Sequence, residues 1–227
     1  MQVDFVIMCG GYGSRLKPFT YIIPKPFLTA NNISPFEYTL RNIPEKLNVR
    51  KIFVTVFYKK DFIKKELRKL NKNIQIIIEK EAMGTAGSLR TIVKKDCSKN
   101  IIITNGDIYS KIDYEKLLDN HIKSNSDITM CIKPHKIPLP YAVMSKKKNQ
   151  IFFKEKPVIV KKINAGIYVI KKNFLVNFFK KNRNNFVNMN QLFENKKKIN
   201  IFDIGNKWID IGHINDFKRA YNEIKKW

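Results

Sequence analysis

The sequence predicts a Rossmann-like α/β fold of three layers (α/β/α), with a mixed, mainly parallel sheet and a small antiparallel lobe. Short apolar segments alternate with helix-like segments as far as Ile132, which is typical of a parallel sheet covered on both faces. Beyond Ile132, closely spaced apolar segments predict antiparallel strands. The chain has 227 residues, of which 44% are hydrophobic, so it can bury a substantial core.

The first half of the chain alternates expected strands and helices. The strands are expected over residues 3–8, 51–57, 73–78, 100–104 and 127–132, and the helices over 35–47, 61–70, 86–95 and 114–123. Asp61 and Asp113 stand at the start of the second and fourth helices. A carboxylate at that position accepts hydrogen bonds from unpaired backbone amides, so both residues are expected to be N-caps.

The second half has a different pattern. Pro134, Pro138 and Pro140 predict a loop, and Asn149 with Gln150 predicts a hairpin turn. Strands are expected over 141–145, 151–154 and 163–170, a strand pair around 201 and 208, and helices over 174–181, 189–195 and 215–226. Because no linker-like stretch intervenes, residues 1–227 are expected to form a single domain with two halves, 1–132 and 133–227.

A formal net charge of +25 raises the question of a nucleic-acid partner. Lysine far outnumbers arginine, although arginine is suited to planar, bidentate contacts with phosphate. The lysines are also dispersed in short runs, which is typical of solvated surfaces. We therefore expect no nucleic-acid partner, whereas a small anionic substrate would benefit from the positive field.

The cysteines and the apolar segments point to a cytoplasmic protein. Cys9, Cys97 and Cys131 show no metal-ligand spacing, so reduced thiols are expected. Residues 1–5 lack the basic and apolar regions of a signal peptide. No apolar run approaches the roughly 20 residues of a membrane helix, so no membrane insertion is expected.

A glycine-rich segment, GGYGSR at residues 10–15, follows the first expected strand. Glycines at that place allow positive φ angles and bring several backbone amides towards a bound anion. Leu16 occupies the position of the last glycine in GxGxxG, so the dinucleotide fingerprint is not met. Taken alone, the segment fits a structural turn as well as a phosphate-binding loop.

Residues 10–26 together read GGYGSRLKPFTYIIPKP. This segment resembles the signature GGxGxRLxPxTxxxPKP of the sugar-1-phosphate nucleotidyltransferases. The resemblance implies that the loop amides and Arg15 hold a nucleoside triphosphate, and that Lys25 contacts phosphate. A guanidinium and an ammonium beside a leaving pyrophosphate would neutralise developing charge.

Later segments resemble the same family in the same order, from Val3 to about Phe217. They read EAMGTAG at 81–87, NGD at 105–107, FKEKP at 153–157, NAGIY at 164–168 and WIDIG at 208–212. The resemblance implies that residues 1–132 mainly bind the nucleotide and residues 133–227 mainly bind the sugar phosphate. The implied nucleotide-binding residues are Met8, Gly10, Gly11, Gly13, Ser14, Arg15, Glu81, Gly84, Thr85 and Ala86.

The resemblance also implies a metal site and a sugar site. Asp107 and Asp210 are expected to bind Mg²⁺, and a carboxylate at a strand's carboxyl end fits such a role. On the sugar side, Glu155 and Asn164 are expected to meet hydroxyls and Lys156 the sugar phosphate. The family's YGV reads Tyr141-Ala142-Val143 here, so a methyl group replaces a glycine hydrogen beside the sugar. The expected catalytic residues are Arg15, Lys25, Asp107, Lys156 and Asp210.

Each motif alone has a simpler interpretation. Asn-Gly-Asp is a common turn, Asp210 alone fits a cap or surface residue, and Glu155-Lys156 alone fits a solvated ion pair. Trp208 and Tyr168 are expected in the core, and Cys9 is expected to be a buried apolar group. The ordered coincidence of the motifs favours the enzyme.

The expected reaction transfers a nucleotidyl group to a sugar 1-phosphate, giving a nucleotide-activated sugar for surface-glycan biosynthesis. A phosphate oxygen attacks the α-phosphorus in line and pyrophosphate leaves, without a covalent intermediate. The segments at 84–86 and 164–168 most resemble guanylyl-transferring members that act on mannose, heptose or amino-sugar 1-phosphates, so the resemblance implies GTP as the donor. Glu79 or Glu81 could accept from guanine N1–H and N2–H₂. Uridylyl, thymidylyl or cytidylyl transfer to a hexose 1-phosphate, and a non-catalytic regulatory subunit, are the alternatives. A homo-oligomer is compatible with the sequence.

Overall fold

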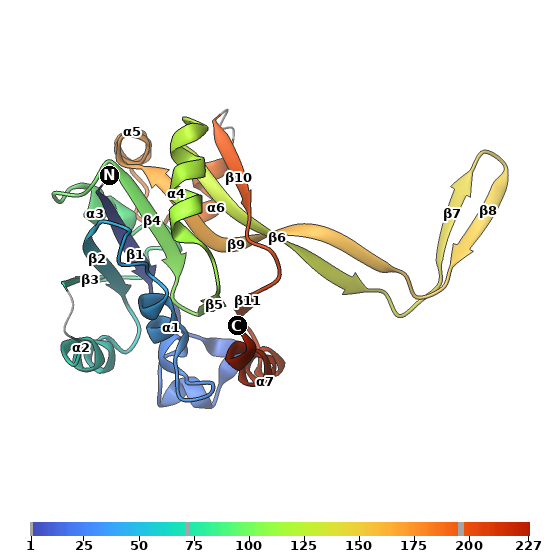
Figure 1. The fold of residues 1–227 in the computed structure, drawn as a ribbon, viewed down its shortest axis with the longest axis horizontal. Helices are drawn as coiled ribbons and strands as arrows, with labels where there is room; N and C mark the ends of the chain where they lie inside the picture. The colour runs from blue at the N-terminus through green and yellow to red at the C-terminus, as the bar shows by residue number, and fades with distance from the viewer. Residues whose placement is uncertain (1, 71–72, 195–197) are drawn as a thin grey trace.

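A computed structural model describes residues 2–70, 73–194 and 198–227, and its main feature is a seven-stranded mixed sheet (Figure 1). The strand order is β10-β6-β9-β4-β1-β2-β3. The bounds are β1 Val3–Met8, β2 Val49–Val56, β3 Ile74–Ile78, β4 Asn100–Asn105, β6 Ile128–Pro138, β9 Val158–Lys171 and β10 Ile199–Asp203. The expected α/β class with a mainly parallel sheet is therefore confirmed.

Strand β1 lies in the middle of a four-stranded parallel group. It pairs with β2 on one side and β4 on the other, and β3 pairs with β2. Residues 3–7 of β1 are all buried, which explains why the sequence there is apolar except at Asp4. Because these strands are parallel, the loops that follow Met8 and Asn105 meet at one edge of the sheet.

Strands β9 and β6 continue beyond the sheet as a ribbon. Strand β9 is antiparallel to both β4 and β6. The outer halves of β6 and β9 leave the body together and lead to a hairpin of β7 (Val143–Lys147) and β8 (Gln150–Lys154), as Figure 1 shows. The expected antiparallel lobe is thus an extended arm.

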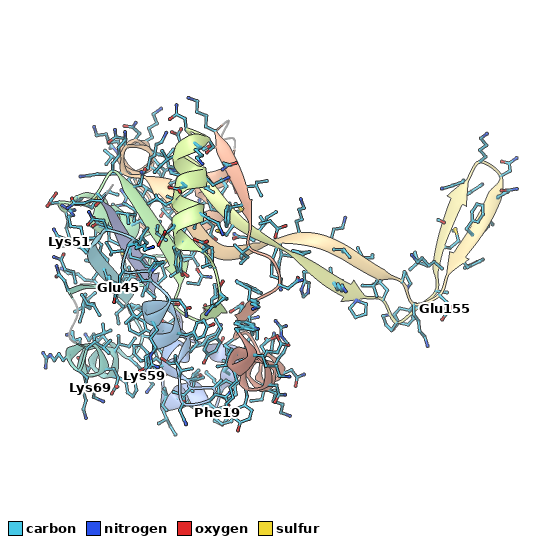
Figure 2. The ribbon with its side chains drawn as sticks, in the orientation of Figure 1. Phe19, Glu45, Lys51, Lys59, Lys69 and Glu155 are labelled. Atoms are coloured by element: carbon cyan, nitrogen blue, oxygen red, sulfur yellow. The ribbon has the colours of Figure 1, made fainter. Side chains whose placement is uncertain are left out.

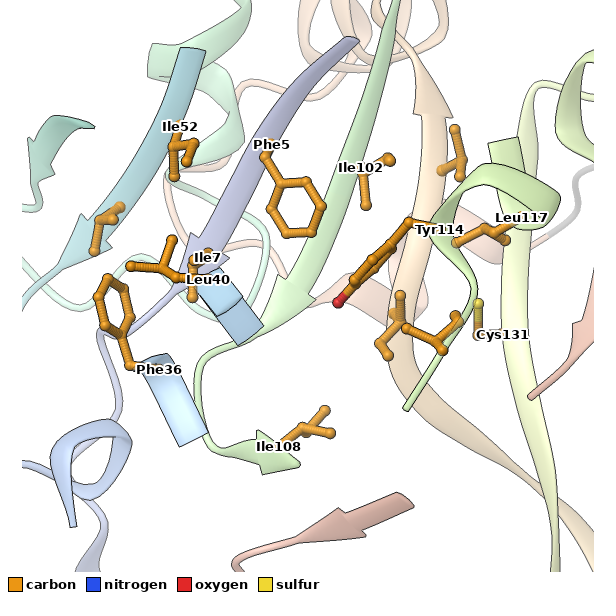
Figure 3. Close-up of a cluster of buried hydrophobic side chains, with 14 of the residues drawn as sticks. Phe5, Ile7, Phe36, Leu40, Ile52, Ile102, Ile108, Tyr114, Leu117 and Cys131 are labelled. Atoms are coloured by element: carbon orange, nitrogen blue, oxygen red, sulfur yellow. The ribbon is translucent and has the colours of Figure 1, made fainter. Parts of the chain in front are cut away.

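Helices cover both faces of the sheet. On one face, α1 (Pro35–Arg41), α2 (Lys60–Arg68) and α4 (Tyr114–Lys123) pack on Phe5, Ile7 and Ile102. The Phe5 and Tyr114 rings meet edge to face with centroids 5.1 Å apart (Figure 3). The other face is covered by α3 (Leu89–Val93), α5 (Lys172–Lys181) and α6 (Met189–Phe193). The alternating side chains of β1 supply both layers.

A third apolar cluster forms beneath the loop that follows β1. Three short 3₁₀ turns, Ser14–Leu16, Phe19–Tyr21 and Lys25–Phe27, shape this loop. The small antiparallel pair of β5 (Ile108–Ser110) and β11 (Trp208–Asp210) packs against these turns. Helix α7 (Ile214–Glu223) and the final 3₁₀ turn, Ile224–Lys226, complete the same apolar cluster. These elements pack together beside the carboxyl edge of the sheet.

Several local expectations differ from the structure. Asp113 caps α4 by accepting from the Lys116 amide at 3.0 Å, as expected, but α2 begins after Lys59 without a side-chain cap, so the expectation for Asp61 was wrong. Strand β6 runs through Pro134 to Pro138 where a loop was expected. The strands near Ile201 and Trp208 pair with β6 and β5 and not with each other. The 189–195 helix ends at Phe193, and Asn195 lies outside the described residues.

None of the helices in the described ranges combines the length and apolar character needed to cross a membrane.

A buried ion pair anchors the opposite, amino edge of the sheet. Asp4 is fully buried, lies 3.0 Å from the Arg50 guanidinium and accepts from the Ser98 amide at 2.6 Å. Arg50 also contacts Asp96, whose side chain is 78% exposed. The two carboxylates thus share one guanidinium but differ completely in solvation.

We expect Asp4→Ala to lower the free energy of unfolding by about 3 kcal/mol, because it leaves the buried Ser98 amide without its acceptor and removes one of the two carboxylates that bind the Arg50 guanidinium. Urea unfolding of the purified variant measures this loss. Asp96→Ala is the matched control, because water can replace that carboxylate, and its effect should be far smaller. Equal losses in the two variants would contradict the argument.

Candidate active site

Two adjoining cavities open at the carboxyl ends of β1 and β4. One has a volume of about 270 Å³ and the other about 210 Å³, and both are bordered by Gly11 and Asp107. The first is lined by Met8, Gly10, Gly11, Tyr12, Thr55, Phe57, Glu79, Ala82, Met83, Gly84, Thr85, Ser88, Asn105, Asp107 and Phe186. The second is lined by Gly11, Gly13, Ser14, Arg15, Leu16, Lys25, Asp107 and Gly212.

The glycine-rich loop is folded tightly against the 3₁₀ turns that follow it. Gly13 has φ +62°, and a Cβ there would lie 2.8 Å from Thr20 Cγ2 and 3.1 Å from Lys25 Cβ. Thr20 donates its hydroxyl hydrogen to the Gly13 carbonyl at 3.0 Å. A side chain at residue 13 would therefore be strained and would push Lys25 out of place.

Three charged side chains meet where the two cavities join. Asp107 follows β4, and the Gly106 amide before it donates to the Met8 carbonyl at 2.8 Å. Asp210 ends β11, which pairs with β5 so that Asp210 lies opposite Ile108. The Lys25 ammonium reaches both carboxylates, at 2.6 Å from Asp107 Oδ2 and 3.5 Å from Asp210 Oδ1. The sequence motifs that are far apart along the chain thus form one cluster.

The cluster is only partly solvated, and this raises the energy of its negative charges. The Lys25 side chain is 11% exposed. The pKa of Asp210 is raised, first by burial and then by repulsion from Asp107, and the contact with Lys25 only partly offsets this. Two carboxylates held together in this way require positive charge beside them.

The donor set at this cluster fits a magnesium ion. Asp107 Oδ1 is buried and has no hydrogen-bond partner in the part of the chain that the structure describes, and the contact of the buried Asp210 Oδ1 with Lys25 is a long one of 3.5 Å. No group of three or more His, Cys, Asp or Glu residues that could hold a metal occurs among the same described residues. Mg²⁺ is commonly bound by one or two carboxylates together with substrate phosphates and water, so the two aspartates suffice.

The first cavity is bordered by a half-buried acid, Glu79. Its pKa is raised by burial, and hydrogen bonds with the Met83 backbone and the Ser88 side chain partly oppose this rise. Glu81 does not line the cavity but accepts from Asn185 Nδ2 at 3.2 Å. Of the two acids considered from the sequence, Glu79 is the one that borders the cavity.

The 84–87 segment is held by the chain around Val187. Gly84 has φ +74°, and a Cβ there would lie 2.5 Å from the Val187 carbonyl oxygen. Gly84 and Thr85 line the cavity, whereas Ala86 is buried and donates its amide hydrogen to Val187 at 2.8 Å. The predicted contact of Ala86 with the nucleotide therefore stays a prediction, and its visible role is to support the segment.

The sugar-side residues predicted from the sequence are not assembled with the rest. Tyr141, Ala142, Glu155 and Lys156 lie on the arm and are exposed. Figure 2 shows Glu155 at the outer end of the ribbon, away from the body of the molecule. Asn164 lies at the base of the ribbon, where it donates to the Tyr168 hydroxyl at 2.7 Å. The structure thus brings together the nucleotide and metal candidates only.

The simpler interpretations hold for four residues. Trp208 and Tyr168 are buried, and the Trp208 indole donates to the Ala165 carbonyl at 2.8 Å. Cys9 is buried, and burial raises the pKa of its thiol well above the usual range. Cys131 is a buried free thiol. None of the four borders either site cavity.

Other lining residues were missed by the sequence reasoning. Phe57, Ser88, Asn105 and Phe186 border the first cavity. Phe57 and Asn105 could have been found, because they stand at the carboxyl ends of β2 and β4. Phe186 comes from a distant loop without any local signal. A larger cavity of about 550 Å³ lies along α5, beside Asp127 and Lys171 at the amino edge of β4, away from this chemistry.

Comparison with known proteins gives a consistent match. The profile of the family described as Nucleotidyl transferase matches residues 5–226. The chain is 29% identical to a protein of Sulfolobus acidocaldarius described as a putative mannose-1-phosphate guanyltransferase, over 98% of this chain and 63% of that one. It is 28% identical to the D-glycero-alpha-D-manno-heptose 1-phosphate guanylyltransferase of Aneurinibacillus thermoaerophilus, over 99% of this chain and all of that one.

Solved structures agree with the fold. The crystal structure of HddC from Yersinia pseudotuberculosis superposes with a TM-score of 0.74 at 26% identity, covering 97% of this chain and 98% of that chain. The chain spans less than two thirds of the Sulfolobus protein but the full length of the Aneurinibacillus protein.

We expect Asp210→Asn to raise the melting temperature at pH 7 in metal-free buffer. The folded protein raises the pKa of Asp210, so the ionised side chain opposes folding once the pH exceeds its ordinary pKa. At a pH below that value both variants are neutral at this position, and the difference should disappear. Thermal unfolding across this pH range measures it.

Asp113→Asn is the control of opposite sign, because hydrogen bonds from Lys116 lower the pKa of Asp113 and its charge stabilises the fold at neutral pH. A destabilised Asp210→Asn variant at pH 7 would contradict the electrostatic description of the site.

Proposed function

Because this chain belongs to the nucleotidyl transferase family, we propose that it transfers a nucleoside monophosphate from a nucleoside triphosphate to a sugar 1-phosphate. The observation that carries this proposal is the convergence of Lys25, Asp107 and Asp210 beside the glycine-rich loop. A cavity that offers backbone amides, an ammonium and two carboxylates suits a triphosphate with its counter-cation.

The second cavity is the proposed site of the triphosphate. The backbone of Gly11, Gly13 and Ser14 borders it, together with the Arg15 guanidinium, which lies 3.3 Å from His213 Nε2. An in-line attack by a phosphate oxygen of the sugar phosphate forms a new bond to the α-phosphorus. The bond to the β-phosphate oxygen breaks, and pyrophosphate leaves with that electron pair. The attacking phosphate is already anionic, so the protein needs no general base.

The charged residues supply positioning and charge neutralisation. Arg15 and Lys25 stabilise the negative charge that develops on the leaving pyrophosphate. Asp107 and Asp210 would hold Mg²⁺, which when bound neutralises phosphate oxygens and holds them together. Their partly buried position strengthens these interactions relative to bulk water.

The proposed donor is GTP. Glu79 borders the first cavity, and its ionised form offers two oxygens to guanine N1–H and N2–H₂, which pyrimidine bases do not present in that arrangement. Burial has removed part of the hydration of this carboxylate, so two new donors would restore its stabilisation. The guanylyl specificity in the descriptions of two relatives supports the same choice.

The proposed acceptor is a sugar 1-phosphate of the manno or manno-heptose type. This choice is supported by the descriptions of the relatives, which act on mannose 1-phosphate and on a heptose 1-phosphate. Lys156 is the proposed contact of the sugar phosphate, and Glu155, Asn164 and Tyr141 are the proposed neighbours of the sugar. Ala142 would place a methyl group, in place of a glycine hydrogen, beside the bound sugar.

The decisive experiment measures pyrophosphate release with four nucleoside triphosphates, each combined with a panel of sugar 1-phosphates. We expect GTP with a manno-configured sugar 1-phosphate to give the highest kcat/KM. Asp107→Asn should lower that value about 100-fold or more, because a metal carboxylate contributes several kcal/mol to the transition state. Asp203→Asn, an exposed carboxylate on β10, is the control and should retain activity. Near-normal Mg²⁺-dependent turnover by Asp107→Asn would overturn the metal assignment.

Exchange of one acid tests the base specificity. Glu79→Gln should lower kcat/KM for GTP about 10- to 100-fold, the loss expected for hydrogen bonds to a charged group, and should change turnover with UTP little. Glu81→Gln is the matched control, because Glu81 lies outside the cavity lining. Steady-state kinetics with both nucleotides measure the effect, and a larger loss in Glu81→Gln would contradict the assignment.

A further inference from the structure

The arm, residues 134–162, is almost entirely exposed. Figure 1 shows it leaving the body as the β6–β9 ribbon and ending in the β7–β8 hairpin, and every residue of that hairpin is exposed. Residue Pro157 is an exception and is buried within the arm itself. Two-stranded hairpins are at best marginally stable in water unless another surface covers them.

The arm presents apolar side chains in adjacent positions. Met144 is paired with Phe153 in the hairpin, and Ile137 is paired with Ile159 in the ribbon, so each pair lies on one face. Phe153 is 73% exposed and Tyr141 is 75% exposed. Ten large hydrophobic residues of the arm are exposed: Ile137, Tyr141, Val143, Met144, Ile151, Phe152, Phe153, Val158, Ile159 and Val160. Apolar patches of this kind mark interaction surfaces.

The body carries a matching apolar surface around the candidate active site. Tyr12, Phe19, Tyr21 and Ile22 lie on the loop that ends at Lys25, and Ile22 is 74% exposed. Ile214 and Tyr221 add exposed apolar groups on α7, which begins beside Gly212 at the second cavity. Residues 12–22, Ile214 and Tyr221 together form the rim of the candidate active site.

The charges near the rim are divided between the loop and the site behind it. The arm carries eight lysines and one glutamate. Residues 12–22 carry Arg15 and Lys17 and no acid, whereas Asp107 and Asp210 lie in the site behind them. The apolar side chains of the rim, and not its charges, are therefore what the arm would pack against, with a lysine of the arm directed to the site.

We propose that two copies of this chain form a two-fold symmetric dimer in which each arm packs on the rim of the other copy. The arm would thereby bring Glu155 and Lys156 of one copy to the Lys25–Asp107–Asp210 cluster of the other. The arm and the rim belong to the same chain but lie apart in this structure. In a two-fold symmetric dimer each arm covers the rim of the other copy, so both surfaces are buried in a closed assembly. The arm is also as long as one side of a standard interface, about 20–30 residues.

The elbow of the arm is shaped to present these residues. The Leu139 amide donates to the Pro157 carbonyl at 3.0 Å, which ties the two strands together between the ribbon and the hairpin. Lys156 lies in this elbow with φ +40°, a left-handed conformation that lysine rarely adopts. Backbone of this kind is retained where the position of a side chain matters.

Mixing two inactive variants tests the exchange of arms, and this test rests on the proposed function. Asp107→Asn inactivates the body and Lys156→Ala inactivates the arm. A heterodimer of the two contains one site with both parts intact, so random mixing after dissociation and reassociation should restore about a quarter of wild-type activity. Mixtures that stay as inactive as the separate variants would show that each arm serves its own body and would overturn the proposal.

Two measurements test the dimer without relying on activity. Sedimentation equilibrium should show a dimer for the wild type and a monomer for the double variant Met144→Ser/Phe153→Ser, whose apolar pair is lost. Lys147→Ser, at the end of β7, is the matched control and should remain a dimer. A wild type that stays monomeric would overturn the proposal.

A photo-crosslinking phenylalanine analogue at position 153 locates the contact. We expect a cross-link between two chains that maps to residues 12–22 or to α7. Cross-links confined to one chain, or to a different protein, would overturn the proposal. If the dimer and this cross-link form but no nucleotide and sugar phosphate react, the proposed function fails while the arrangement of the arms stands.

Discussion

The repulsion between Asp107 and Asp210 is the constraint around which this site is organised. The two carboxylates belong to segments far apart along the chain, and the β5–β11 pairing holds them together in a partly solvated cavity. The ionised pair opposes folding, and the Lys25 ammonium offsets this cost only in part. The glycine-rich loop serves this purpose, because its tight turn at Gly13 leaves room for the Lys25 stem. The geometry of the proposed phosphate site thus follows from the need to neutralise two acids.

Much of this arrangement could be predicted from the sequence, because its signals are local and ordered. Strand β1 was predicted with both ends correct, since an apolar run meets a glycine turn. Helix α4 was also predicted with both ends correct, since Asp113 caps it. The residues of the cluster were found through motifs that recur in the order of a known family. The sequence did not show which of Glu79 and Glu81 borders the nucleotide cavity, because both stand in the same short segment. The structure shows that Glu79 does.

Other features could not be predicted from local patterns. Pro134 and Pro138 suggested a loop, yet proline is tolerated at the open edge of a two-stranded ribbon, where no partner requires its missing amide hydrogen. The turn signal at Asn149 and Gln150 between the expected strands 141–145 and 151–154 predicts a hairpin, but it does not say which surface the hairpin packs against. That information lies in contacts between distant segments, as does the place of Phe186 beside the first cavity.

The ribbon of β6 and β9 fixes both the distance of the hairpin from the body and the face that the hairpin presents. Each residue of a strand adds about 3.3 Å of length, and successive side chains point to opposite faces. Removing two residues from both strands would shorten the reach by about 7 Å and keep every side chain on its face. Removing one residue from each would turn the hairpin over and present Phe153 to the opposite side. A change of the ribbon by an even number of residues per strand would therefore keep the face that the hairpin presents, whereas an odd number would reverse it.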